Sequence, residues 1–507
     1  MAHADATTRI EKDTMGEMPV PTEALYGAST QRAVLNFPIS GRPVPAAIIG
    51  AYAEIKAACA KANHDLGHLD AERREAIAAA CERIASRDLP APPGADPIAY
   101  HFPIDVFQTG SGTSTNMNVN EVIANLVCVA NEAPIGSSKD PDYLAGKGRF
   151  AHMPATPRGG VHPNDHVNMG QSSNDTFPTA MHVAAAVEIG RALIPALRVV
   201  AGELERLAGQ FQPVIKIGRT HLQDATPIRL GQEFGGFAAQ MRHAEERLAR
   251  AMVALGELPV GGTAVGTGIN TDAAFGGLVA AELSRRLGVP FREARNHFEA
   301  QHAKDAFVEA SGALRTIAVS LTKIANDIRL MGSGPRCGLG ELLLPAVQPG
   351  SSIMPGKVNP VICEAVIMAS CRVIANDAAV TLGALGGVGS LLDLNVAMPM
   401  MAEAMLDSIS LLARSCHVLT DNLLKGLQAD EKRCAELIEQ SLAMCTSLVP
   451  AIGYDRSAAL AKRAHKEGKT VRELALEQGV LPAERLAALL DPGAMTTYGN
   501  AGAPGGG

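Results

Sequence analysis

Apolar residues recur at helical spacing along most of the chain. The segment from Ala46 to Ala85, which includes AYAEIKAACAKAN, places apolar side chains three and four positions apart, the spacing of an amphipathic helix. Similar patterns cover 178–209, 227–255 and about 300–331. Pro-rich or Gly-rich breaks at 89–97 and 259–270 separate them. We predict an all-α fold without a strand-rich region or an internal repeat.

Residues 358–401 form a long, sparsely charged stretch. Over these positions the only charges are Glu364, Arg372, Asp377 and Asp393. A helix this apolar on every side is expected to be buried on every side. One helical subunit can rarely bury several such segments, so we infer a helix-bundle core shared between subunits. The uncharged stretch between Asp377 and Asp393 is too short and too Gly-rich for a membrane span.

Composition narrows the class of protein. A length of 507 residues suggests about three domains. Hydrophobic residues make up 47% and charged residues 19%, which excludes a disordered chain. The net charge of −7 excludes a globally basic nucleic-acid binder.

The nine cysteines contain no CxxC pair, and the N-terminus has no apolar stretch typical of a signal peptide. Scattered, reduced thiols favour a cytoplasmic protein.

Four separated segments are rich in Ser, Thr, Asn, Gln and Gly. They are QTGSGTSTNMNVNE (108–121), HPNDHVNMGQSSNDT (162–176), GRTHLQD (218–224) and GSSIMPGKVNP (350–360). Each lies just before or inside a helical pattern, where free N–H groups and the helix macrodipole favour an anion. Any one segment alone could be an ordinary cap or turn. Four that converge would suit a small molecule with two carboxylates.

Two nucleotide-binding motifs can be set aside. A phosphate-binding P-loop needs four residues between Gly and Gly-Lys, followed by Ser or Thr. Here five residues separate Gly350 from Gly356, and Val358 follows the lysine. The Gly pairs at 110–112 and 266–268 do not continue as GxGxxG. A nucleotide fold is therefore disfavoured.

Three histidines are candidates for chemistry. His162 and His166 are four residues apart, but Pro163 between them indicates a turn, and the sequence offers no third metal ligand. We expect no metal. His221 lies in a polar context, and histidine is the side chain best suited to proton transfer near neutral pH.

Together these segments resemble the fumarase/aspartase superfamily and, within it, class II fumarate hydratase. The superfamily signature is similar to Gly350–Pro360, and matching blocks follow one another over nearly the full length. These blocks are Gly110–Asn120, His162–Asp175, Gly218–Glu233, Gly261–Asn270, Ser333–Gly340 and Gly453–Gly468. Gly356 and the Ser172–Asp175 run (SSND), together with GGTAVGTGIN and SGPRCGLGE, resemble the fumarase form more than the aspartase form.

The resemblance implies an all-α subunit of three domains, with a long central helix bundle shared in a homotetramer. We place the N-terminal lyase domain at 1–171, the central helix-bundle domain at 172–428, and a small C-terminal domain with a flexible tail at 429–507. Active sites of the family are built from three subunits. The resemblance implies no metal or organic cofactor, no nucleic acid and no membrane, with a small dicarboxylate as substrate.

The implied reaction is reversible anti addition of water to fumarate, giving L-malate through an aci-carboxylate. By resemblance Ser351 is the general base, and Lys357 helps to stabilise its alkoxide. His221 is the acid, acting through a water, and Glu364 pairs with it and orients it.

Two further sets of residues follow from the resemblance. The substrate carboxylates would be held by Ser111, Gly112, Thr113, Asn116, Ser172, Ser173, Asn174, Thr220, Lys357 and Asn359. A second anion site would comprise His162, Asn164 and Asp165, although a purely structural turn is about as plausible for these three.

The sequence departs from the family pattern in three places. Residues 133–160 are longer than the usual linker, and a tolerated surface loop is the preferred interpretation. Met169-Gly170 replaces the common Lys-Ser, and 387–395 differs from the usual segment. These departures leave open an aspartate ammonia-lyase or another lyase giving fumarate, and more distantly a non-catalytic structural relative.

Overall fold

The computed structural model describes residues 7–151 and 160–498, which form two compact units. The first unit comprises Met1–Pro195, Glu246–Thr316 and Cys371–Leu412. The second comprises Ala196–Glu245, Ile317–Ser370 and Ala413–Gly507. Each unit is described by itself.

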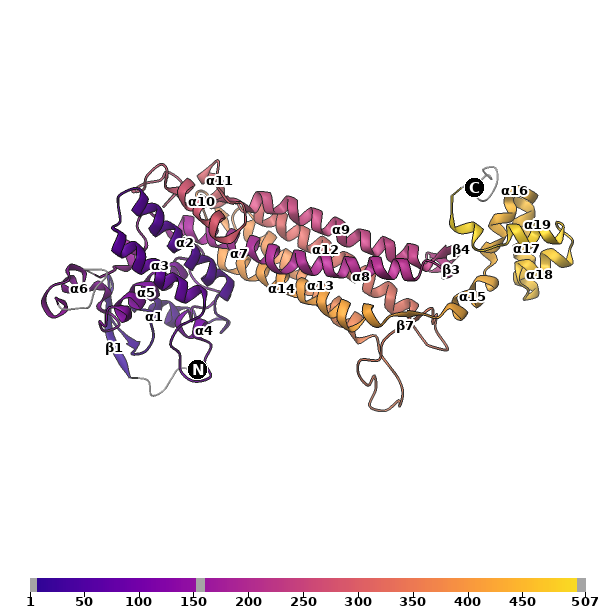
Figure 1. The fold of residues 1–507 in the computed structure, drawn as a ribbon, viewed down its shortest axis with the longest axis horizontal. Coiled ribbons are helices and arrows are strands. Elements are labelled where there is room, and N and C mark those ends of the chain that lie inside the picture. The colour runs from indigo at the N-terminus through magenta and orange to yellow at the C-terminus, as the bar shows by residue number, and fades with distance from the viewer. Residues whose placement is uncertain (1–6, 152–159, 499–507) are drawn as a thin grey trace. The chain divides into compact units, whose positions relative to one another are not determined.

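The first unit is built around the Ala-rich helix α2, which contacts helices α3, α7 and α10 (Figure 1). Its side chains at Ile48, Tyr52, Ile55 and Cys59 are fully buried, as the helical spacing in the sequence predicts. The helices of this unit are α1 (Ala28–Asn36), α2 (Ala46–Asp65), α3 (Ala71–Ala85), α4 (Pro97–His101), α5 (Thr113–Ala130), α6 (Pro141–Ala145), α7 (Ser173–Glu188), α10 (Phe275–Leu287) and α11 (His297–His302).

Five helices continue from one unit into the other. They are α8 (Ile194–Gln210), α9 (Leu230–Leu255), α12 (Asp305–Met331), α13 (Val361–Ala384) and α14 (Met398–Asn422). The patterns predicted at 227–255 and about 300–331 agree with α9 and α12. The pattern at 178–209 covers α7 and α8, which a π-helical turn at Ile189–Leu193 joins.

The second unit ends in a small helical domain with its own core. Ile438, Leu448, Leu460, Leu474 and Leu486 pack together there. The helices that supply this core are α15 (Glu431–Gln440), α16 (Val449–Ile452), α17 (Tyr454–Glu467), α18 (Val471–Glu477) and α19 (Ala483–Leu489).

The expectation of an all-α fold is confirmed. Within the described residues the strands form only two-stranded pairs. They are β1 (Thr8–Asp13) with β2 (Gly16–Pro21), β3 (Ile215–Thr220) with β4 (Gln223–Arg229), β5 (Glu257–Leu258) with β6 (Arg292–Glu293), β7 (Leu342–Leu343) with β10 (Gln428–Ala429), and β8 (Ser390–Leu391) with β9 (Leu394–Asn395).

The β3–β4 hairpin corrects one expectation. The segment GRTHLQD was expected before or inside a helix, but it forms the end of this antiparallel hairpin, in which Thr220 faces Gln223. Ile215 and Ile217 lie on either side of Lys216, and this period of two matches a strand and not a helix. The helical pattern read from residue 227 begins only at Leu230.

Helix α13 is not buried on every side by the described part of one chain. Met368 is 68% exposed, Leu382 53% and Ile374 38%. The expected burial assumed a core shared between subunits, so this exposure does not contradict it. The most apolar 18-residue window of α13 has a mean hydropathy of 1.4 and is 33% buried. One such helix is weak evidence for a membrane span, because core helices pass the same test. Within residues 7–151 and 160–498, nothing covers this face of α13.

Residues 133–151 of the long linker have more structure than a tolerated surface loop would need. Tyr143 of α6 is fully buried and packs with Phe150 and Cys128. The two rings meet edge to face, with centroids 5.4 Å apart, and Asn131 Nδ2 donates to Tyr143 Oη at 3.1 Å. Residues 152–159 of this segment, and the expected flexible tail at 499–507, lie outside the described residues.

Replacing Tyr143 by Ala should lower the free energy of unfolding by about 3 kcal/mol, because it empties a buried aromatic site. Urea unfolding of the variant would measure the loss. Tyr454→Ala is the matched control, since that ring is 66% exposed. Equal unfolding curves for the two variants would show that the segment adds nothing to stability.

Candidate active site

The starts of α5 and α7 meet in the first unit. Ser111 Oγ lies 2.8 Å from Thr113 Oγ1, which in turn lies 2.7 Å from Ser173 Oγ. Helix α5 begins after Gly112, whose φ is +74°. A Cβ there would lie 1.9 Å from Cδ2 of Phe177, so the close approach of the two helices requires glycine. Three hydroxyl groups and two helix N-termini thereby form one donor-rich cluster.

A buried lysine lies behind this cluster. Lys56 of α2 is 0% exposed, and its ammonium donates to Oδ1 of Asn116 at 2.8 Å and to Oδ1 of Asn168 at 2.9 Å. A third bond, 2.9 Å long, goes to Oε1 of Gln171. Burial lowers the pKa of Lys56 to about 8. The lysine joins the first turn of α5 to the segment that leads into α7.

Asp175 fixes the other side of the cluster. Its Oδ1 accepts the backbone N–H of Ser172 at 2.9 Å, and Ser172 Oγ accepts that of Asn174 at 3.2 Å, which closes a capping box. Its Oδ2 accepts the N–H groups of Gly261 at 3.1 Å and Thr263 at 2.9 Å. Burial raises the pKa of Asp175 to about 6, although the backbone donors oppose the shift.

The predicted second anion site forms a single turn. His162 Nδ1 accepts the backbone N–H groups of Asn164 at 3.2 Å and Asp165 at 3.0 Å. The ring of His166 accepts the N–H of His162 at 2.8 Å. Burial lowers the pKa of His166 to about 4 and also lowers that of His162. Both rings are therefore neutral at pH 7 and are used to cap their own turn.

His221 lies at the exposed end of the β3–β4 hairpin. His221 and Leu222 both have positive φ, 55° and 60°, as a two-residue type I′ turn requires. Residues other than Gly or Asn adopt this conformation at a cost of about 1 kcal/mol or more each. Arg219 holds the hairpin through bonds from Nη1 to both oxygens of the buried Glu341, at 2.9 and 2.8 Å.

The loop that carries Ser351, in the second unit, is held by hydrogen bonds among its own residues. Ser351 Oγ accepts the backbone N–H groups of Ile353 at 3.2 Å and Met354 at 3.0 Å. The N–H of Gly350 donates to Lys357 O at 2.9 Å, and Asn359 Nδ2 donates to Gly350 O at 2.6 Å. The loop therefore presents a hydroxyl oxygen that already faces two fixed donors.

Lys357 and Asn359 line an open hollow of about 500 Å³ beside the end of α12. Glu364 is exposed on the first turn of α13. Among the residues that the structure describes, no hydrogen bond or ion pair joins Glu364 to His221. Their pairing stays a prediction.

The hydroxyl cluster brings together Ser111, Gly112, Thr113 and Ser173, and the neighbouring Asn116, Ser172 and Asn174 are held around it. In the second unit the hairpin carries Thr220 and His221, the Ser351 loop carries Ser351, Lys357 and Asn359, and α13 carries Glu364.

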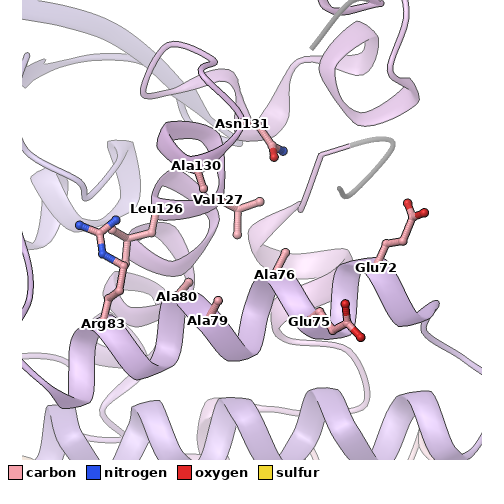
Figure 2. Close-up of a pocket in the computed structure, with 10 residues that line it drawn as sticks. All are labelled: Glu72, Glu75, Ala76, Ala79, Ala80, Arg83, Leu126, Val127, Ala130 and Asn131. Carbon is pink, nitrogen blue, oxygen red and sulfur yellow. The ribbon is translucent and has the colours of Figure 1, made fainter. Parts of the chain in front are cut away.

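A separate pocket involves none of these residues. Figure 2 shows it between α3 and α5, with Ala76, Ala79 and Val127 on its walls and Arg83 and Glu75 at its edges.

Three supporting residues were missed in the sequence. Lys56 has a recognisable signal, because it lies four residues after Tyr52 on the stripe of α2 that is otherwise apolar. The roles of Asp175 and Glu341 depend on contacts with loops far along the chain, which helical spacing cannot reveal.

Comparisons with known proteins show which family the chain belongs to. Residues 16–375 match the family described as Lyase, and 444–497 match the family described as Fumarase C C-terminus. The class II fumarate hydratase of Corynebacterium glutamicum is 52% identical over 94% of this chain and 93% of its own. The chain belongs to the class II fumarase family. The mitochondrial fumarate hydratase of Rattus norvegicus is 48% identical, over 94% of this chain and 88% of its own.

Solved structures of family members share the fold. The class II fumarase from Schistosoma mansoni superposes with a TM-score of 0.88 at 35% identity, and the match covers 97% of this chain and all of that one. The cobalt-bound fumarate lyase:delta crystallin from Brucella melitensis has a TM-score of 0.86 at 42% identity, again over 97% of this chain and all of that one.

Asp175 should make stability depend on pH. Its folded-state pKa of about 6 lies above the value of about 3.9 for an unfolded Asp. The contribution of Asp175 to the free energy of unfolding is therefore complete below about pH 4 and is lost as the pH rises through about 6. Relative to Asp175→Asn, the wild type should lose about 2 kcal/mol between about pH 4.5 and about pH 7.5.

Urea unfolding of both proteins at the two pH values measures this difference. Asp272→Asn, which changes an exposed carboxyl of the same unit, is the control. A gap between wild type and Asp175→Asn that stays constant with pH would contradict the assignment.

Proposed function

We propose that this protein catalyses the reversible hydration of fumarate to L-malate by anti addition of water. The observation that carries the proposal is the donor cluster at the starts of α5 and α7, in a chain that is about half identical to fumarate hydratases over nearly its whole length. Neutral donors at two helix N-termini suit a substrate with two carboxylates.

The chemistry explains the need for fixed donors. In the malate direction a base removes a proton from the carbon next to a carboxylate, and the charge spreads into that carboxylate as an aci-acid. Donors that are already in place stabilise this charge without having to reorganise. We assign this task to Ser111, Gly112, Thr113, Asn116, Ser172, Ser173, Asn174, Thr220, Lys357 and Asn359.

Ser351 is the proposed base. A serine hydroxyl is a poor base in water and needs its alkoxide stabilised. The two backbone N–H groups that point at its Oγ supply part of that stabilisation, and Lys357 of the same loop supplies a positive charge.

His221 is the proposed acid that delivers a proton to the leaving hydroxide through a water. Its exposed position at a strained hairpin end leaves its ring free to meet groups from another copy of the chain. Glu364 is the proposed partner that orients it. His162, Asn164 and Asp165 stay a candidate second anion site, although their mutual bonds also support the purely structural interpretation.

We further propose a homotetramer with active sites shared between subunits. The exposed apolar face of α13 supports this assembly, because contiguous apolar surface of this kind marks a protein interface. A cytoplasmic location stays part of the proposal. Named relatives include bacterial and mitochondrial fumarate hydratases.

The alternative is an aspartate ammonia-lyase, which the unusual Met169-Gly170 and 387–395 segments leave open. Purified protein given L-malate should produce fumarate, seen by its ultraviolet absorbance, whereas L-aspartate should give none. Fumarate from aspartate alone would refute the hydratase and favour the ammonia-lyase.

Ser351→Ala should lower kcat by about 100-fold or more. Ser352→Ala, at the exposed neighbouring position, should leave kcat within about threefold. A Ser351→Ala enzyme as active as its control would remove Ser351 from the mechanism but not the hydratase activity.

A further inference from the structure

The geometry points to Lys56 as a positioning residue that fixes the amide of Asn116 with its NH₂ group available to the substrate carboxylate. This inference rests on the proposed function, because it concerns the same dicarboxylate site. Lys56 does not belong to the hydroxyl cluster itself and acts through Asn116.

Each hydrogen of the Lys56 ammonium has an acceptor. Lys56 Nζ carries three hydrogens and no acceptor. The three amide oxygens of Asn116, Asn168 and Gln171 surround it at 2.8–2.9 Å. All three acceptors are neutral, so this buried charge is hydrogen-bonded without forming an ion pair within the described chain. A buried charge is tolerated only with such compensation, and this compensation fixes the directions of three side chains.

The Lys56 ammonium also decides the orientation of the Asn116 amide. The two ends of an amide have nearly the same shape but opposite hydrogen-bonding character. Because the ammonium can only donate, Asn116 must turn Oδ1 toward Lys56. One hydrogen of Asn116 Nδ2 is directed to Asn168 Oδ1 at 3.1 Å. The other remains to donate to an anion, whereas a flipped amide would present an oxygen and repel it.

Lys56 lies between the start of α5 and the residues that lead into α7. Asn116 lies one turn after Thr113, and Gln171 directly precedes Ser172. Asn168 Oδ1 accepts from Lys56, from Asn116 and from Asn120 Nδ2 at 3.2 Å. One side chain on α2 therefore sets the spacing of the two segments that supply the hydroxyl cluster.

The surroundings of the ammonium supply a second readout. The ionisable groups that act on it are Cys59 on its own helix, Asp175 on α7 and Cys81 on α3, and its ammonium lies 5.9 Å from the centre of the Tyr52 ring. Desolvation outweighs them and lowers the pKa of Lys56 to about 8. Above that pH the neutral amine has only two hydrogens for three acceptors, so KM should rise.

The test is steady-state kinetics of fumarate hydration with the full-length assembled enzyme. Lys56→Met should raise KM for fumarate about 10- to 100-fold and change kcat by less than about fivefold, because the lost interaction orients a binding group. Lys61→Met on the same helix, where the side chain is partly exposed and paired with Asp65, should leave both constants unchanged.

A double-mutant cycle with Asn116→Ala tests whether Lys56 acts through that amide. The effect of Lys56→Met on KM should fall below about threefold once Asn116 is gone. If the two effects on KM simply multiply, Lys56 acts by another route and the inference is overturned.

The wild type provides a measurement that needs no variant to fold. Its KM for fumarate should rise as the pH increases from about 7 to about 9.5, since the Lys56 ammonium titrates in that range. A constant KM over this range would overturn the inference. So would Lys56→Met kinetics equal to those of Lys61→Met in an active enzyme. A wild type inactive on fumarate and malate would instead refute the proposed function.

Discussion

The uncovered apolar face of α13 is the constraint on which the rest of the account depends. Met368, Ile374 and Leu382 are exposed there, and each would gain about 1 kcal/mol or more from burial. The described part of the chain offers nothing that covers this face. A second copy of the same helix has the matching composition, and like surfaces pair in symmetric oligomers. Assembly in turn allows one active site to take its groups from different chains, so a single chain can carry an incomplete one.

The neutral donors at the starts of α5 and α7 are held in place by hydrogen bonds. The hydroxyl groups of Ser111, Thr113 and Ser173 touch one another, and no charged side chain lies among these three. Two buried charged groups fix them from behind, Lys56 through amides and Asp175 through backbone N–H groups. Donors held in this way can bind a carboxylate without having to reorganise.

The sequence predicts the long helices and the cap at Ser172 well, because helical periodicity and capping residues are local signals. The β3–β4 hairpin was not predicted from the sequence because its strands are short and adjoin a strong helical pattern. The sequence predicts that one subunit alone does not bury the 358–401 stretch, but its composition does not say which side chains a second chain would cover. The packing of Tyr143 on Cys128 and the contacts of Lys56 with Asn168 are long-range, and neither has a periodic signature.

Sedimentation velocity coupled to activity, for wild type and Met368→Lys, tests the central claim most directly. A lysine on the apolar face of α13 should leave an unassembled or partly assembled chain, because burying its charge would cost several kcal/mol. The wild type should sediment as a larger, active species. Met368→Lys should sediment as a smaller species with activity lowered about 100-fold or more. Leu476→Lys, at a 49% exposed position of α18, should change neither property. A monomer with full activity would contradict the shared site.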